Sequence, residues 1–167
     1  PLLANIYLHE VLDEWFARDV MPRLYGKGFL VRYADDFVML FSQEADAKRV
    51  MNVLPKRFGK YGLTLHPEKT RLVPFRRPPR SSCGERGGKG PGCFDLLGFT
   101  HYWGRSRKGS WVIKRKTARD RLSRSLMRIA HWCRRMRHSP VSEQHTGLAR
   151  KLKGHYGYFG ITGNSKS

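Results

Sequence analysis

Cysteine is scarce in this sequence, and long apolar segments are missing from it. Three cysteines, Cys83, Cys93 and Cys133, are too few for a disulfide framework. Cys83 and Cys93 could be imagined as zinc ligands together with His101, but their spacing matches no C-x-x-C pattern, so we expect free thiols. No signal peptide and no apolar run of membrane length is visible, which predicts a cytoplasmic protein without a membrane partner.

Acidic residues are also few. The 167 residues include 33 lysines and arginines but only 13 acids, for a formal net charge of +20 and a pI of about 10.6. Residues 1–75 carry 11 basic residues against 9 acids, whereas residues 76–153 carry 21 against 4. This balance argues against an ordinary enzyme of small metabolites and favours a polyanionic partner. We expect the chemistry in the first part and nucleic-acid binding in the second.

Apolar residues recur at helical spacing in some segments and alternate in others, which predicts a mixed α+β protein. Helices are expected over residues 2–21, 45–61, 117–137 and 142–156. Strands are expected on either side of the Asp35–Asp36 pair, at 63–66, and as a small sheet over 94–103 and 110–114. Thr117 and Asp120 fit a capping box, and Ser142 is expected to cap the last helix. Residues 76–92, rich in Arg, Pro, Ser and Gly, are expected to form a mobile basic loop.

The segment 29–41 is apolar apart from Arg32, Asp35 and Asp36. Burying a carboxylate among such neighbours costs several kcal/mol unless a positive charge or hydrogen bonds compensate it. One arginine cannot neutralise two acids. A divalent cation with oxygen ligands, most simply Mg²⁺, solves the problem and points to two-metal phosphoryl transfer. The alternative for the pair alone is an ordinary turn, because aspartate favours turns.

Five short stretches occur in order along the chain. They are residues 1–9 (PLLANIYLH), 33–36 (YADD), 65–70 (LHPEKT), 97–101 (LGFTH) and 150–156 (RKLKGHY). Together they resemble the reverse transcriptase, or maturase, encoded by bacterial group II introns, over nearly the whole chain. Retron and diversity-generating reverse transcriptases share the Asp-Asp turn, but the stretch KGHY after a basic helix favours the intron type.

The resemblance implies a right-hand polymerase: a palm, with an antiparallel sheet and helices packed on one face, followed by a partial helical thumb. The implied divisions are the C-terminal part of the palm (1–75), a basic flexible loop (76–93), a primer-grip-like hairpin region (94–114) and a partial thumb or X domain (115–167). The family carries another metal-binding aspartate and basic fingers upstream of these motifs. We therefore expect an incomplete fragment with little activity alone, in a bacterial cytoplasm.

The resemblance also implies roles for individual residues. Asp35 and Asp36 correspond to the catalytic, metal-binding pair, and Lys69 to a general acid for the departing pyrophosphate. Tyr33 corresponds to the residue under the primer terminus. The nucleotide and template pocket corresponds to Leu2, Leu3, Ala4 and Asn5. The primer grip corresponds to Leu97, Gly98 and Phe99. Each has a plainer alternative: a solvated turn lysine for Lys69, a core position for Tyr33, ordinary helix positions for Leu2 and Leu3, and a bulge for Gly98.

The predicted helix over 117–137 has an apolar face made of Leu122, Leu126, Ile129, Ala130 and Cys133. The RNA-binding residues expected on its other face and in the next helix are Arg119, Arg121, Arg124, Arg128, Arg134, Arg135, Arg150, Lys151 and Lys153. Arginines with almost no acids beside them repel one another, which favours RNA phosphate as a partner over a merely solvated surface.

The function that these expectations describe is RNA-directed DNA synthesis by a group II intron protein. It uses Mg²⁺, or Mn²⁺ in its place, with an RNA template, a DNA primer and a dNTP, and it binds intron RNA as a splicing maturase. The alternative is a non-catalytic RNA-binding splicing factor or a degenerate remnant. A basic ribosomal type of protein explains neither the Asp pair nor the order of the motifs. The sequence leaves the oligomeric state open.

Overall fold

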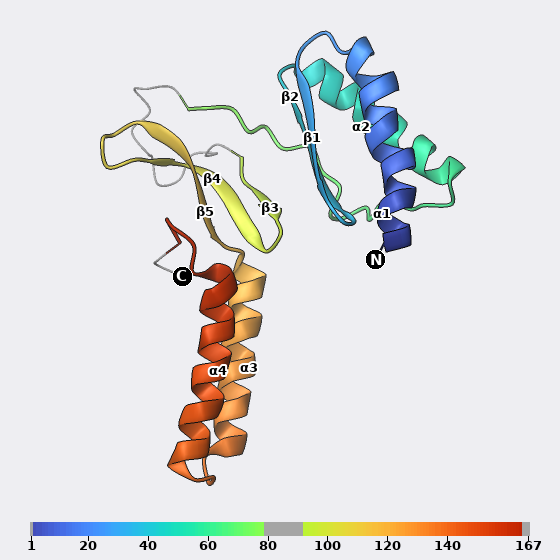
Figure 1. Ribbon diagram of the computed structural model, residues 1–167. Coiled ribbons are helices and arrows are strands. Elements are labelled where there is room, and N and C mark those ends of the chain that lie inside the picture. The colour runs from blue at the N-terminus through green and yellow to red at the C-terminus, as the bar shows by residue number, and fades with distance from the viewer. Residues whose placement is uncertain (1, 79–91, 165–167) are drawn as a thin grey trace. The chain divides into compact units, whose positions relative to one another are not determined.

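The computed structural model describes residues 2–78 and 92–164 (Figure 1). The chain divides into two compact units, Pro1–Val73 and Pro74–Ser167. Both mix helices with a small antiparallel sheet, as expected of an α+β protein. Most of the expected mobile loop, residues 79–91 with Cys83, lies outside the described residues. No helix in the described part is both long and apolar enough to cross a membrane.

The first unit begins with a nearly continuous helical segment, as predicted for residues 2–21. It starts as the α-helix α1 (Leu2–Leu8), continues through two π-helical stretches, η1 (His9–Glu14) and η2 (Phe16–Val20), and ends in the 3₁₀ turn η3 (Met21–Arg23). Its second half is buried through Leu12 and Phe16, which are 0% and 3% exposed. Its first turns are exposed, and Leu3 is 81% exposed.

A β-hairpin follows, formed by β1 (Gly28–Tyr33) and β2 (Asp36–Phe41). Successive residues of a strand face opposite sides, so β1 turns Leu30 toward the hydrophobic core and leaves Phe29 and Val31 exposed. Phe37 and Phe41 reach the core from β2.

Helix α2 (Glu44–Lys60) supplies the other side of this core through Val50, Leu54 and Phe58, as its apolar spacing predicted. The strand expected at 63–66 is not formed, and that prediction is wrong. Leu63 and Leu65 alternate because they pack against the core. Their backbone pairs with no strand of the described residues.

The second unit contains the small sheet predicted from the sequence, with the strand order β3 (Phe94–Leu96), β4 (Phe99–Arg105) and β5 (Trp111–Thr117). The strands β3 and β4 are joined by Leu97 and Gly98, which have φ angles of 52° and 78°. Positive φ at both central residues is the pattern of a type I′ turn. Gly98 therefore occupies a turn rather than the bulge considered as an alternative.

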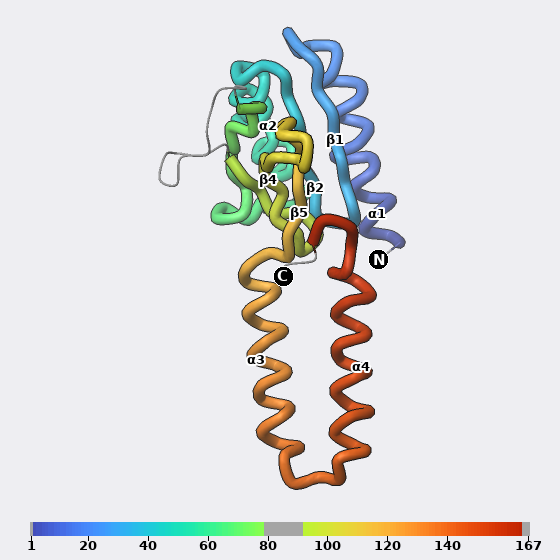
Figure 2. Tube along the Cα trace, turned by 90° about the vertical axis from the view of Figure 1, so that its left-hand side faces the viewer, coloured from blue at the N-terminus to red at the C-terminus, as the bar shows by residue number. Residues whose placement is uncertain are grey.

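Two helices, α3 (Arg119–Met136) and α4 (Val141–Phe159), lie antiparallel and side by side in both views (Figures 1 and 2). The half-buried positions of α3 follow a heptad spacing: Leu122, Ser125, Ile129, Trp132 and Met136. Three residues of the predicted apolar face are exposed instead: Leu126, Ala130 and Cys133. In the described part α3 packs along one helix, so a single stripe of its surface is covered.

Both predicted helix caps are wrong. Thr117 is the last residue of β5 and accepts a hydrogen bond at its Oγ1 from Asn164 Nδ2, 2.9 Å away. The N-cap of α3 is Ala118, and that of α4 is Pro140, which places Ser142 inside the first turn. Thr117 and Asn164 are 4% and 6% exposed, so a buried long-range contact has replaced the local capping pattern.

Two glycines of α4 provide a matched test of helix packing. A Cβ added at Gly147 would lie 2.4 Å from the Trp132 ring, whereas one added at Gly154 would meet no atom within 4 Å. Gly147→Ala is expected to lower the free energy of unfolding by about 1–3 kcal/mol through overpacking. Gly154→Ala is expected to raise it by about 0.5–1 kcal/mol, because alanine favours helices. Urea unfolding of both variants checks the sign, and equal effects would contradict this packing.

Candidate functional site

The Asp pair lies at the connection of the β1–β2 hairpin, as the sequence predicted. Tyr33 and Asp36 are cross-strand partners, so Ala34 and Asp35 form a two-residue turn and Asp36 opens β2. Ala34 has a φ of 54°, a left-handed conformation that costs a non-glycine residue on the order of 1 kcal/mol or more. Such a conformation persists where the surroundings hold it in place.

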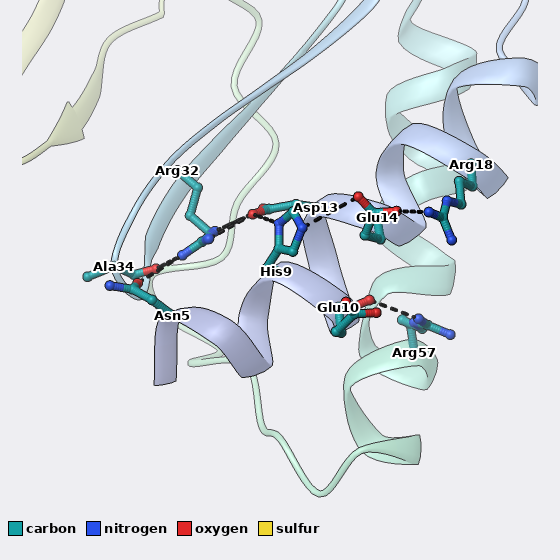
Figure 3. Close-up of polar contacts among 9 residues, drawn as sticks. All are labelled: Asn5, His9, Glu10, Asp13, Glu14, Arg18, Arg32, Ala34 and Arg57. Carbon is teal, nitrogen blue, oxygen red and sulfur yellow. Dashed lines mark hydrogen bonds and ion pairs between the residues drawn. The ribbon is translucent and has the colours of Figure 1, made fainter. Parts of the chain in front are cut away.

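Arg32 does not pair with these aspartates. Its Nε and Nη2 donate to the two carboxylate oxygens of Asp13 over 2.9 and 2.7 Å (Figure 3). Within residues 2–78 and 92–164, Asp35 and Asp36 make no hydrogen bond or ion pair through their carboxylates, and both residues are exposed. The turn therefore presents two adjacent carboxylates that remain open to a ligand.

The remaining donor of Arg32 connects the turn to the first helix. Arg32 Nη1 donates to Asn5 Oδ1 over 3.1 Å and to the carbonyl oxygen of Ala34 over 2.9 Å (Figure 3). Sequence reasoning missed this role, because it considered Arg32 only as a partner for the Asp pair. A signal was present: strand alternation places Arg32 on the inner face of the hairpin, opposite Phe37, where a charged group needs a partner.

A row of polar side chains extends this contact along the helix. His9 lies 3.3 Å from Asp13 and 3.5 Å from Glu14, and Glu14 pairs with Arg18 at 2.6 Å (Figure 3). The π-helical stretch η1 makes the double contact of His9 possible, because it brings residues five apart closer along one side of the helix. His9 thus contacts Oδ2 of Asp13, the same carboxylate oxygen that accepts from Arg32 Nη2.

The hydrogen bond from Arg32 holds the pKa of the Asp13 carboxyl below its ordinary value of 3.8, against the opposing effect of burial. The same contact raises the pKa of the Arg32 guanidinium. Both shifts favour the charged pair, whose side chains are 26% and 15% exposed.

The predicted nucleotide and template residues are only partly brought to the Asp pair. Asn5 reaches it through Arg32, whereas Leu2, Leu3 and Ala4 are exposed on α1. Tyr33 is 68% exposed and lies across the strand pair from Asp36, so it is a surface residue rather than a core one.

The other predicted catalytic residue, Lys69, is exposed in a turn. Its backbone N–H donates to the carbonyl oxygen of His66 over 3.2 Å. Within the described residues, Lys69 forms no ion pair with either aspartate.

The predicted primer-grip residues belong to the second unit. Leu97 accepts a hydrogen bond from the Tyr158 hydroxyl at 2.8 Å, and Gly98 accepts one from the backbone N–H of Ala118 at 2.9 Å. The Phe99 ring stacks on Tyr158 with centroids 5.7 Å apart. The β3–β4 turn is thus fastened to the start of α3 and the end of α4.

The predicted RNA-binding residues are all exposed on α3 and α4. One row along a single side of α3 follows from helical spacing and contains Arg121, Arg124, Arg128 and Arg135. Arg119 and Arg134 lie outside that row, so the six arginines do not share one face. Lys151 lies with its ammonium 5.5 Å from the centre of the Trp132 ring.

Metal-binding groups are few in the described residues. No cluster there brings together three or more His, Cys, Asp or Glu side chains able to hold a metal ion. Cys93 and Cys133 are free thiols, as predicted, whereas Cys83 is not among the described residues. The Asp35–Asp36 pair suits Mg²⁺, which proteins commonly bind through one or two carboxylates while substrate phosphates and water complete its shell.

The Asp13–Arg32 pair should make the first unit sensitive to acid. Asp13→Asn is expected to lower the free energy of unfolding of this unit by about 1–2 kcal/mol at pH 7. Because the pKa of Asp13 is depressed on folding, its contribution is present above 3.8 and disappears as pH falls through the lower folded value. The difference from the unmutated chain should therefore narrow below pH 3.8.

Urea unfolding at pH 7 and pH 3, followed through hydrogen exchange of residues 28–41, measures this difference. Asp19 is an exposed aspartate on the same helical segment, so Asp19→Asn serves as the control. This variant should change the free energy of unfolding little at either pH. A pH-independent loss in Asp13→Asn would contradict the ionic character of the contact.

Comparison with protein families identifies a match over the first part of the chain. A family model described as reverse transcriptase (RNA-dependent DNA polymerase) matches residues 1–101. Searches of curated proteins and of solved structures returned no match. The matched region contains the hairpin with Asp35 and Asp36 and covers more than half of the 167 residues. The chain belongs to the reverse transcriptase (RNA-dependent DNA polymerase) family.

Proposed function

We propose that this chain takes part in RNA-directed DNA synthesis, in which a primer 3′-hydroxyl attacks a dNTP opposite an RNA template. The observation that carries the proposal is the open pair of carboxylates, Asp35 and Asp36, on a turn that Arg32 fastens to the first helix. Family membership supplies the general activity, and the pair supplies groups able to perform it.

In the proposed mechanism Asp35 and Asp36 would hold Mg²⁺, or Mn²⁺ in its place. When bound, the ion supplies Lewis-acid stabilisation of the charge that develops on the phosphoryl oxygens. The Tyr33 ring, exposed across the strand pair from Asp36, supports the primer terminus. Asn5 lies on the helix side of the turn, where it orients the incoming nucleotide and template with Leu2, Leu3 and Ala4. Lys69 donates a proton to the departing pyrophosphate.

The finer part of the proposal is a group II intron origin. The order of the five motifs along the chain supports it, together with the strongly basic part after residue 76. In this proposal Leu97, Gly98 and Phe99 grip the primer strand, and the exposed basic residues of α3 and α4 bind intron RNA for splicing. The cell compartment proposed with it is a bacterial cytoplasm.

A second candidate is a non-catalytic RNA-binding splicing factor. The absence of a third metal-binding side chain beside Asp35 and Asp36 within the described residues favours it, because two-metal catalysis needs carboxylates that converge from separate strands. In this case the basic part binds RNA and the hairpin serves as a scaffold.

Asp35→Asn separates the two candidates. In a primer-extension assay on an RNA template with Mg²⁺, this variant should lose at least about 10³-fold in rate, since metal stabilisation is worth several kcal/mol. RNA affinity should stay the same, because the changed carboxylate contributes nothing to phosphate binding.

The unmutated chain and Asp19→Asn are the controls for this assay. Equal extension by all three proteins would refute the role of Asp35. RNA binding by all three without any extension would support either the splicing factor or the incomplete polymerase fragment expected from the sequence.

The arginine row of α3 is expected to contact RNA phosphates. Replacing Arg121, Arg128 and Arg135 together by glutamine should reduce the slope of log affinity against log salt by about 2, since each phosphate contact on single strands contributes roughly 0.7. Filter binding to single-stranded RNA between low and high salt measures this slope.

A control with the same loss of charge comes from the same helix, with glutamine at Arg119, Arg134 and Arg137, which lie outside the row. The slope of log affinity against log salt should change less in this control than in the variant of the arginine row. Equal slopes in the two triple variants would show that binding follows net charge rather than the row.

A further inference from the structure

Arg32 is a charged residue on a hairpin face whose other side chains are apolar. It lies on the inner face of the hairpin, its cross-strand partner is Phe37, and its side chain is 15% exposed. Phe37 itself packs on Phe58 of the core, with ring centres 6.0 Å apart. A charged group in such a place is retained only when its donors are satisfied.

The donors of Arg32 are divided between two tasks. Nε and Nη2 bind Asp13 with the side-by-side geometry that is favourable for a guanidinium and a carboxylate. This contact fixes the plane of the guanidinium and leaves Nη1 directed at Asn5 Oδ1 and the Ala34 carbonyl oxygen. Asp13 thus orients the guanidinium, and Nη1 donates the hydrogen bond to the turn.

The Ala34 carbonyl is the decisive acceptor. It belongs to the peptide unit that joins Ala34 to Asp35, and a peptide unit is planar. A hydrogen bond to this oxygen therefore sets the orientation of the plane that enters Asp35. The bond acts on a residue with a φ of 54°, a conformation that alanine rarely adopts.

We infer that Arg32 is a positioning residue for the Asp35–Asp36 pair: it locks the Ala34–Asp35 peptide to the first helix through Asp13 and Asn5. Arg32 touches no reacting group and acts through the direction in which the turn presents its carboxylates. The inference deepens the proposed function and rests on it, because a positioning role presupposes that these carboxylates bind the metal.

Lysine cannot take over this arrangement. Its ammonium is a single point of charge, whereas the guanidinium presents donors in a fixed fork that reaches separate acceptors at once. Arg32→Lys keeps the charge and is expected to satisfy Asp13 while releasing Ala34 and Asn5. Arg18→Lys is the matched control, because Arg18 also pairs with a helix carboxylate, Glu14, but does not touch the turn.

The experiment uses the full chain labelled with ¹⁵N and ¹³C. Titrated Mn²⁺ broadens the amide signals of residues near a bound ion, which reports occupancy at Asp35 and Asp36 without any need for catalysis. Backbone coupling constants report the φ of Ala34 in the same samples. We expect Arg32→Lys to require about tenfold more Mn²⁺ for equal broadening and to lose the positive φ. Arg18→Lys should change neither.

The outcomes separate the inference from the proposed function. Unchanged Mn²⁺ broadening and unchanged Ala34 φ in Arg32→Lys would overturn the inference. If the unmutated chain shows no broadening at Asp35 and Asp36, the metal role proposed for the pair fails. In that case the φ of Ala34 tests the inference by itself. Loss of the positive φ in Arg32→Lys supports the locking role of Arg32, and a retained positive φ overturns it.

Asp13→Asn covers the case in which Arg32→Lys does not fold. It keeps an oxygen acceptor at that place but removes the charge that aims the guanidinium. The inference is supported if Asp13→Asn raises the Mn²⁺ concentration needed for equal broadening, by less than Arg32→Lys does, and partly loses the positive φ of Ala34. A folded Asp13→Asn chain with both properties unchanged would overturn it.

Discussion

Packing against helices keeps the β1–β2 hairpin folded, because two strands alone are at best marginally stable in water. Phe41 meets Phe16 of the first helical segment with ring centres 6.3 Å apart, and Phe37 meets Phe58 of α2 at 6.0 Å. This burial also determines the register. A slip by one residue would turn the whole apolar set outward, so the core decides that Asp35 lies on the turn.

One polar group interrupts that inner face. Arg32 points to the same side as Leu30, among side chains that pack on the core. Burial of a guanidinium is tolerated when every direction of its fork finds an acceptor, and here the acceptors come from a helix, a side-chain amide and the turn itself. The hydrogen bonds that satisfy this half-buried charge therefore also hold the backbone of the exposed turn.

Much of the first unit could be predicted from periodicity, because helix 2–21, helix 45–61 and the strands around Asp35 each carry their own apolar pattern. The predictions that failed depended on distant partners. Leu63 and Leu65 alternate like a strand but meet a core instead of a strand edge. Thr117 has a local capping pattern but binds Asn164, 47 residues away.

In the candidate site, too, local features could be predicted from the sequence and long-range contacts could not. The position of Asp35 at a turn could be predicted from neighbouring residues. The contact of Arg32 with Asp13 and Asn5 spans 19 and 27 residues, and no local pattern announces it. On α3, spacing alone identified an apolar side but could not say how much of it one neighbouring helix would cover.

The anchoring of the β3–β4 turn bears on how the second unit is made on a ribosome. Leu97 is held by Tyr158, 61 residues later in the chain, and Thr117 by Asn164. The three strands are therefore synthesised before the residues that hold their turn and their last strand. Until residues 158–164 have been translated, the β3–β4 turn and the last residue of β5 lack these partners. The speed of translation through α4 then sets how long the three strands remain without them.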